Sequence, residues 1–400
     1  MAKLSIEKVD VAGKRVLVRV DFNVPMEDGR ITDDRRISAA VPTIQSITRR
    51  GGRVIVMSHL GRPSGSGYEA DQSLKPVAAR LGELLGQKVE FPSTDCVDDS
   101  ALSASSSLAD GEVLLLENLR FHAGETSNDP EFAAKLARHG EIFCNDAFGA
   151  AHRAHASIVG VPSAMPNAPK AAGLLMLKEL RYLSDILEDP ERPFVAVLGG
   201  AKVSDKLGAI RRLLDRVDIV LVGGAMAYTF LHELGRRVGS SRVESDCFSD
   251  ARAIIDKAAE HRADMFLPSD HVCGKGMTEQ TPIEVFADHI EEGWAGYDIG
   301  PKTQALYEEK IRSAKTIVWN GPMGVFEVGP FAVGTEMIAR AIAEATKRGA
   351  TTVIGGGDSA AAVERFDLAD QYTHVSTGGG ASLQMLEGES LPGVDALTDD

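Results

Sequence analysis

The chain has 400 residues, of which 44% are hydrophobic and 25% are charged, and this composition is typical of a folded globular protein with two or three domains. No apolar run approaches the ~18–20 residues that a membrane helix needs, so we expect no membrane partner. The formal net charge of −15 argues against nucleic acid as a partner. The acidic excess is uneven, because residues 1–172 carry 20 basic and 22 acidic side chains whereas residues 173–400 carry 23 and 36.

The cysteines and the N-terminal residues indicate a cytoplasmic protein. The four cysteines are far apart in the sequence and form no C-x-x-C pair, which argues against a disulfide framework or a paired-cysteine zinc motif. The first residues lack the apolar core of a signal peptide and include an early acid, Glu7. We therefore expect a reducing, cytoplasmic location.

Short apolar, β-branched runs alternate with longer stretches of helical spacing along the whole chain. Continuous apolar runs of this kind are typical of parallel strands that are covered by helices on both faces. The ten runs that predict strands are 16–20, 54–57, 113–116, 142–144, 194–198, 219–222, 265–267, 316–319, 352–354 and 373–375.

Ten strands are too many for one ordinary sheet, so the sequence predicts an α/β protein with two doubly wound parallel-sheet (Rossmann-like) domains facing across a hinge cleft. The predicted domains are 1–172, joined by a C-terminal tail at 389–400, and 188–388. The stretch 173–187 has an apolar helical face and ends before a proline-rich stop, which makes it a candidate interdomain helix. It could equally be the last helix of the first domain.

Polar side chains follow all four predicted strands of the first part. In open parallel sheets, ligands bind beyond the carboxyl ends of the strands, so these side chains are expected at one edge. Several arginine forks on one edge suit a small polyanion. The alternative is that they form salt bridges with Asp21, Glu117 and Asp146. The basic residues in question are His59, Arg62, Arg120, His122, His152 and Arg153.

Glycine-rich turns follow the strands of the second part. Glycine triplets at 355–357 and 378–380 let backbone N–H groups approach an anion at the start of a helix. Lys202 and Lys206 follow the first strand and lie on one helical face. Asp358 could cap the helix or face a metal ion bound to phosphates. With Glu327, these features predict a nucleotide cradle.

The sequence contains neither a P-loop nor the protein-kinase signature motifs, and no Rossmann fingerprint follows a strand. A polyanion site on one domain and a nucleotide site on the other suit phosphoryl transfer, in which closure excludes water and positive groups stabilise the transferring phosphoryl group.

The motifs together resemble the phosphoglycerate kinase family over essentially the whole chain. Each motif is moderately specific alone, and their occurrence in this order is very specific. The stretches that carry the resemblance are 18–25, 58–63, 116–121, 145–149, 200–206, 319–327, 356–359 and 376–382.

The resemblance implies reversible phosphoryl transfer from 1,3-bisphosphoglycerate to MgADP, giving 3-phosphoglycerate and MgATP, by a monomer. It places Arg36 and Lys206 at the transferring phosphoryl group with the amides of Gly357 and Gly380, and Asp358 on Mg²⁺. The implied substrate-binding positions are Asp21, Asn23, Arg36, His59, Leu60, Gly61, Arg62, Arg120 and Arg153. The implied nucleotide positions are Lys202, Lys206, Gly296, Glu327, Gly356, Gly357, Asp358 and Ser359.

Three departures from the family pattern lie outside these positions: Ala150 where Thr is common, Ala225 where Gly is common and Gln384 where an acid is common. Two other functions stay open from the sequence. One is a nicotinamide-dependent dehydrogenase of a phosphorylated small acid, against which the missing fingerprint argues. The other is a binding module without activity, against which the retained Arg36, Lys202, Lys206 and Asp358 argue.

Overall fold

The computed structural model describes residues 2–261 and 263–400, which divide into two compact units. Unit 1 comprises Met1–Arg181 and Ser390–Asp400, and unit 2 comprises Tyr182–Glu389. The division falls inside helix α7 (Leu174–Glu188). The predicted interdomain helix and hinge cleft remain predictions.

Unit 1 contains a six-stranded sheet whose pairings are all parallel. In spatial order its strands are β5 (Val89–Glu90), β6 (Val113–Leu115), β4 (Arg53–Met57), β1 (Arg15–Arg19), β7 (Ile142–Asn145) and β8 (Lys170–Ala172). The helices of this unit are α1 (Arg35–Thr48), α2 (Lys75–Leu85), α3 (Asp99–Ser107), α4 (Ala123–Thr126), α5 (Pro130–Ala137), α6 (Val161–Ala164) and α15 (Pro392–Asp395), and a small hairpin pairs β2 (Met26–Glu27) with β3 (Arg30–Ile31).

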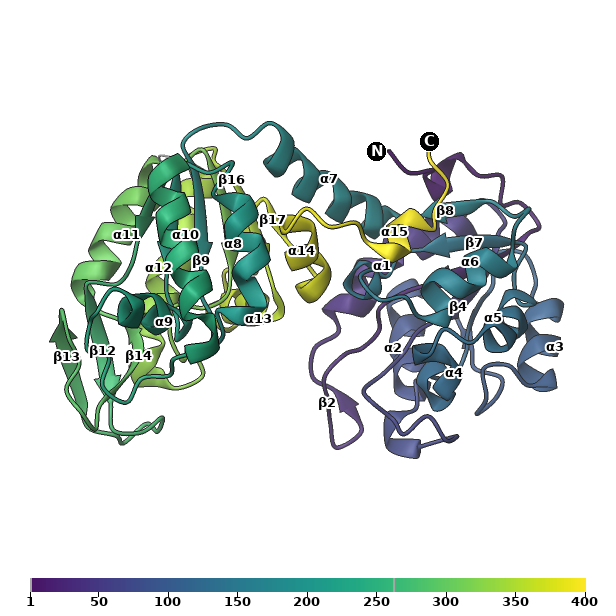
Figure 1. Cartoon of the computed structure of the whole chain (residues 1–400). Helices are drawn as coiled ribbons and strands as arrows, with labels where there is room; N and C mark the ends of the chain where they lie inside the picture. Colours follow the sequence, from purple (N-terminus) through teal and green to yellow (C-terminus); the bar gives the residue numbers. More distant parts are fainter. Residues whose placement is uncertain (1, 262) are drawn as a thin grey trace. The chain divides into compact units, whose positions relative to one another are not determined.

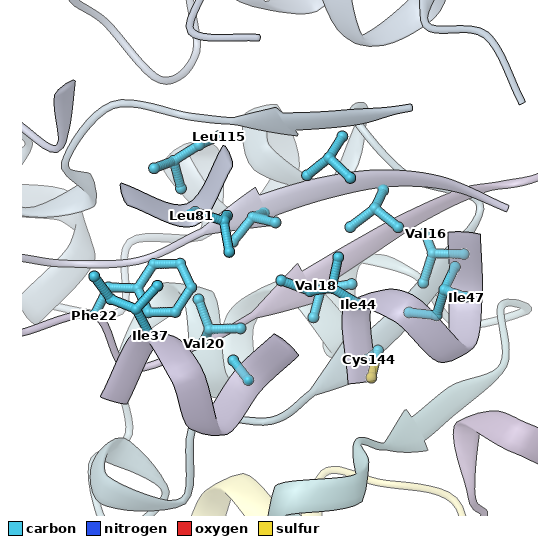
Figure 2. Close-up of a cluster of buried hydrophobic side chains, with 14 of the residues drawn as sticks. Val16, Val18, Val20, Phe22, Ile37, Ile44, Ile47, Leu81, Leu115 and Cys144 are labelled. Carbon is cyan, nitrogen blue, oxygen red and sulfur yellow. The ribbon is translucent and has the colours of Figure 1, made fainter. Parts of the chain in front are cut away.

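The core of unit 1 explains why its central strands are apolar throughout. Val16, Val18 and the residue after β1, Val20, belong to a buried cluster with Ile44 and Ile47 of α1, and Figure 2 shows these side chains between strand and helix. Because helices cover both faces of a parallel sheet, both sets of alternating side chains are removed from water.

Local sequence signals fix several helix ends of unit 1. The Asp98 and Asp129 carboxylates accept the Ala101 and Phe132 amides at 2.7 Å, so each caps the start of its helix. Gly86 ends α2 in the left-handed conformation, with φ of 67°.

Unit 2 repeats this architecture with a second six-stranded sheet whose pairings are also all parallel. Its order is β11 (Asp264–Phe266), β10 (Ile219–Val222), β9 (Phe194–Leu198), β15 (Thr316–Asn320), β16 (Thr351–Gly355) and β17 (His374–Val375). Its helices are α8 (Leu207–Leu213), α9 (Met226–Glu233), α10 (Phe248–His261), α11 (Pro301–Ser313), α12 (Val333–Lys347), α13 (Gly357–Arg365) and α14 (Gly379–Leu386).

All ten strands expected from the sequence are present, and the α/β class with two parallel sheets is confirmed. Two short strands of the first sheet, β5 and β8, were not predicted. Neither was an antiparallel sheet in unit 2 with the order β13 (Ile283–Ala287), β12 (Asp270–Gly274), β14 (Ala295–Ile299), seen beside α9 in Figure 1. β13 is mostly exposed, so it lacks the continuous apolar run that marks the buried strands.

The C-terminal tail belongs to unit 1, where the two termini lie side by side (Figure 1). Lys3 pairs with Asp399 at 2.7 Å, and the Leu4 amide donates to the Thr398 carbonyl at 2.9 Å. The Gly393 amide donates to the Ala151 carbonyl at 2.8 Å. The tail is thus tied to the segment that follows β7. No helix of the described residues is long and apolar enough to cross a bilayer.

Candidate functional site

In unit 1, the parallel register brings the residues that follow β1, β4 and β6 to one edge of the sheet. Asp21 follows β1, and its carboxylate lies 3.9 Å from Nδ1 of His59, which follows β4. The Asn23 side chain accepts the Gly61 amide at 2.7 Å. Arg120 follows β6 and donates to the Gly61 carbonyl at 2.6 Å. The structure therefore gathers residues that the sequence places up to a hundred positions apart.

Arg36 reaches the same edge from the first turn of α1. Its Nη1 donates to Asp21 Oδ2 at 3.2 Å and to the Asn23 carbonyl at 3.0 Å. Burial alone would raise the pKa of Asp21, but the positive charges of Arg36 and Arg19 together with the Asn23 backbone N–H lower it below its ordinary value. The ionised Asp21 thus orients Arg36, whose side chain stays 34% exposed and open to a ligand.

Three arginines, Arg62, Arg120 and Arg153, line one pocket of about 360 Å³ together with His122 and His155, and we call these three the pocket arginines. Burial, then Arg153 and Arg19, lowers the pKa of Arg120 to about 10. Its Nε is buried without a hydrogen-bond partner. A donor left unpaired in this way costs free energy unless an acceptor arrives, so the pocket is built for an anion.

The acids that could have neutralised this pocket are engaged elsewhere. Glu117 accepts the Ser73 hydroxyl at 2.6 Å, and Asp146 accepts the Met176 amide at 3.1 Å. Asp21 is paired with Arg36. No ion pair among residues 2–261 and 263–400 involves the pocket arginines. Of the six basic residues in question, only His59 lies within ion-pair distance of one of the three acids, so the salt-bridge alternative fails for the pocket arginines.

Beneath this edge, the fully buried Arg19 orients His59. Its Nε donates to Ser157 Oγ at 2.8 Å, and its Nη2 lies 3.1 Å from His59 Nδ1. Since a guanidinium only donates, Nδ1 accepts and the His59 proton sits on Nε2. Burial lowers the pKa of His59 well below its usual value. Asp21 opposes this shift, and the neighbouring arginines add to it. His59 is thus a neutral N–H donor.

In unit 2, backbone hydrogen bonds join three loops at the carboxyl ends of β9, β10 and β15. The Gly200 amide donates to the Pro322 carbonyl at 2.9 Å, the Gly224 amide to the Met323 carbonyl at 2.9 Å, and the Met226 amide to the Gly200 carbonyl at 3.1 Å. Glycines permit this close approach because they have no Cβ. The loops line a pocket of about 400 Å³ that also includes Ala225, Gly296, Glu327 and Asp358.

Gly296 lies on β14 at a position where no side chain fits. Its amide donates to Ser241 Oγ at 2.9 Å, and a Cβ added there would lie 1.9 Å from the Tyr228 hydroxyl. The missing Cβ thus leaves room for the buried Tyr228, while Gly296 itself lines the pocket. Glu327 is exposed at the pocket wall.

Two helix N-termini lie close together beside this pocket. Gly356, with φ of 90°, leads into α13, whose first residue is Gly357. A Cβ added to Gly379, the first residue of α14, would lie 3.9 Å from the Gly357 amide nitrogen. Gly357 and Gly380 are exposed, so their amides are accessible. Two converging helix starts form a strong anion-binding surface.

Lys206 lies at the end of a 3₁₀ turn, Ser204–Lys206, and its Nζ donates to Asn320 Oδ1. Burial lowers the pKa of Lys206 to about 8, although Asp358, Asp205 and Glu387 oppose the shift. Lys202 is exposed and forms no ion pair with any described residue. One lysine is therefore fixed and the other is free to reach a ligand.

Asp358 and Ser359 occupy the first turn of α13 and differ in role. The Asp358 side chain is exposed and does not cap the helix, which leaves its oxygens available. Ser359 Oγ is buried and accepts the Gly321 amide at 2.6 Å. Its hydroxyl thus supports the loop after β15, and only its backbone is oriented as part of the helix start.

Sequence reasoning assigned no role to Arg19 or Asn320, although both lay within stretches that it singled out. A charged residue inside an apolar strand run, Val18-Arg19-Val20, was the available signal for the first. Asn320 ends its strand directly before a glycine turn. Their partners, His59 and Lys206, come from other strands and loops, so only the folded chain shows the pairings.

Taken together, the fold and its two sites define an α/β phosphotransferase that handles a small anionic substrate and a nucleotide. The family model described as "Phosphoglycerate kinase" matches residues 6–389. Curated phosphoglycerate kinases of Thermosipho africanus and Chloroherpeton thalassium are 53% and 52% identical, covering 99% and 100% of this chain and 98% and 100% of their own lengths. The chain belongs to the phosphoglycerate kinase family and has phosphoglycerate kinase activity.

Solved structures agree with this assignment. The phosphoglycerate kinases of Coxiella burnetii and Pyrococcus horikoshii superpose with a TM-score of 0.86 each, at 40% and 34% identity, and cover 98% of this chain and of their own. The family membership excludes the dehydrogenase alternative and the inactive binding module.

Proposed function

We propose that unit 1 binds 3-phosphoglycerate or 1,3-bisphosphoglycerate and that unit 2 binds ADP or ATP. The observation that carries the substrate assignment is the set of pocket arginines lacking any carboxylate partner. Arginine forks match the oxygens of a phosphate, and the pocket arginines are suited to the 3-phosphate. Asp21, Asn23, His59 and the backbone at Leu60 and Gly61 are suited to the hydroxyl and carboxyl oxygens.

Transfer in the ATP-forming direction breaks the bond between phosphorus and the acyl oxygen, which leaves as a carboxylate. A new bond forms between phosphorus and a β-phosphate oxygen of ADP. No covalent nucleophile of the protein is needed, because positioning and charge stabilisation supply most of the rate enhancement. The substrates must meet directly, and the hinge closure expected from the sequence is part of this proposal.

The residues proposed at the transferring group supply positive charge where negative charge spreads. Arg36, held by Asp21, approaches from the substrate side, and Lys206, held by Asn320, from the nucleotide side. The amides of Gly357 and Gly380 add the helix-start donors. Lys202 neutralises the nucleotide phosphates. The backbone at Gly356 and Ser359 completes the cradle, while Gly296 and Glu327 contact adenine and ribose.

Asp358 is the proposed ligand of Mg²⁺. An exposed carboxylate at a pocket that binds phosphates fits this ion, which is commonly held by one or two carboxylates together with substrate phosphates. When bound, the ion would neutralise phosphate charge on the nucleotide. The proposal further includes a monomer in the cytoplasm, with domains at 1–172 plus 389–400 and at 188–388, and an interdomain helix at 173–187.

The experiment that tests the substrate site compares two arginine variants in an ADP-dependent assay with 1,3-bisphosphoglycerate generated in situ. Arg62→Ala removes a pocket arginine, and we expect KM for the sugar-acid substrate to rise at least tenfold with little change in KM for ADP. Arg53→Ala is the control: Arg53 is the first residue of β4 and pairs with Asp110, and its loss should leave both constants unchanged. An unchanged KM in Arg62→Ala would refute the assignment.

A further inference from the structure

The structure brings a cysteine, a histidine and an aspartate together beside the pocket of the pocket arginines, which His122 also lines. Asp95 and Cys96 lie in the loop between β5 and α3, and His122 directly precedes α4. Their ligand atoms all lie within 4.8 Å of one another. This is the one group of three or more such side chains found among residues 2–261 and 263–400.

We propose that Asp95, Cys96 and His122 form a binding site for a thiophilic divalent cation such as Zn²⁺. Thiolate, imidazole and carboxylate are the three ligand types that zinc takes in proteins. With ordinary zinc–ligand lengths of about 2.0–2.3 Å and tetrahedral angles, neighbouring ligand atoms are about 3.4–3.6 Å apart. His122 Nε2 and Asp95 Oδ1 are 3.1 Å apart, so this pair already has nearly that spacing.

The imidazole is held in place from several sides. Its ring stacks on Phe132, with centroids 4.9 Å apart and planes at 28°. The main chain of His122 pairs with Ser66, and the next amide, Ala123, donates to the Gly65 carbonyl at 3.0 Å. A preorganised ligand loses little conformational freedom on binding. His122 should therefore bind a cation more tightly than a mobile surface histidine would.

The carboxylate is also prepared by its own loop. Asp95 Oδ1 accepts the Val97 amide at 2.8 Å, which orients the side chain toward His122. The Cys96 side chain is buried, whereas Asp95 and His122 are partly exposed. An ion entering from solvent therefore meets the Asp95 oxygen and the His122 nitrogen first and the Cys96 sulfur last.

A surface depression of about 600 Å³, lined by Val97, His122 and Phe132 among others, borders the cluster on the side of His122. Binding displaces the thiol proton of Cys96, which passes to the buffer, while the His122 ring binds through Nε2 and carries its proton on Nδ1. Water fills the fourth position. The bound ion would join the 93–98 loop to the segment that follows β6.

Calorimetry with Zn²⁺ as the probe tests the site on the full chain after chelator treatment. We expect one equivalent to bind, with proton release measured from two buffers of different ionisation enthalpy. Cys96→Ser and His122→Gln should each weaken binding at least tenfold. Control variants are Cys247→Ser, which removes another cysteine, and His261→Gln, which removes a surface histidine paired with Asp215; both should bind as the parent chain does.

Cobalt spectroscopy gives an independent measurement. Co²⁺ at this site should produce a thiolate charge-transfer band that is absent in Cys96→Ser and retained in the two control variants. Asp95→Asn changes a half-buried ligand, so it tests the site even if a variant at the buried cysteine fails to fold. It should also weaken Zn²⁺ binding. No stoichiometric Zn²⁺ binding, equal affinity in the cluster and control variants, or a cobalt spectrum without thiolate character would each overturn the proposal.

Discussion

Gly224→Ala tests whether the nucleotide pocket depends on direct backbone contact between loops. Gly224 has φ of 67°, and a Cβ added there would lie 2.4 Å from the Gly200 nitrogen, 2.5 Å from the Gly200 oxygen and 2.9 Å from the Pro322 oxygen. Ordinary contacts are 3.4–4 Å. All three neighbours are backbone atoms, so no side chain can rotate away and the loops must separate by about 1 Å, the difference between these distances.

The expected cost has two parts. A non-glycine residue in the left-handed region costs about 1–2 kcal/mol. Forcing apart a packed contact costs about a further 1–3 kcal/mol. The free energy of unfolding should therefore fall by about 2–5 kcal/mol, and ADP affinity should fall at least tenfold because the displaced loops line the pocket.

Gly235→Ala provides the matched control. Gly235 has φ of 76° in the same unit, with nothing within 4 Å of an added Cβ, so it carries the conformational cost without the collision. It should lose about 1–2 kcal/mol and bind ADP normally. Urea unfolding and calorimetric ADP titration of both variants give the comparison. Equal loss of stability with unchanged ADP affinity in both would refute the reasoning.

Three other predictions address the charged groups. Arg36→Ala should abolish most turnover while calorimetry shows nearly intact ADP binding, and full activity would refute its role. Because the pKa of Lys206 is lowered to about 8, its positive charge is lost as pH rises through 8, and kcat/KM for MgADP should decline there. Lys206→Arg should move this decline to higher pH, and an unchanged pH profile in the variant would count against the role of Lys206. Arg19→Met leaves the buried Glu125 without its cation and should cost about 3–5 kcal/mol in urea unfolding, partly restored by adding Glu125→Gln; a silent Arg19→Met would contradict this.

The sequence predicted the class of fold because buried parallel strands need continuous apolar runs, and these are visible locally. It did not predict β13, whose exposed Ile283 and Val285 give no such run. It also placed His122 with the basic edge. His122 does line the pocket, but its Nε2 is paired with Asp95 at 3.1 Å, a residue of a different loop.

The residue types of both sites were likewise determined by the sequence alone. Arginines, glycine turns and single acids that follow strands indicate anion, backbone and cation binding before any partner is known. The tertiary structure decided which of them have partners. Glu117 accepts the Ser73 hydroxyl and Asp146 accepts an amide at the start of α7, so neither carboxylate pairs with the pocket arginines. Lys206 is held by Asn320, which is distant in the sequence. Charge and propensity are properties of a residue, whereas pairing depends on distances that only the packed sheets set.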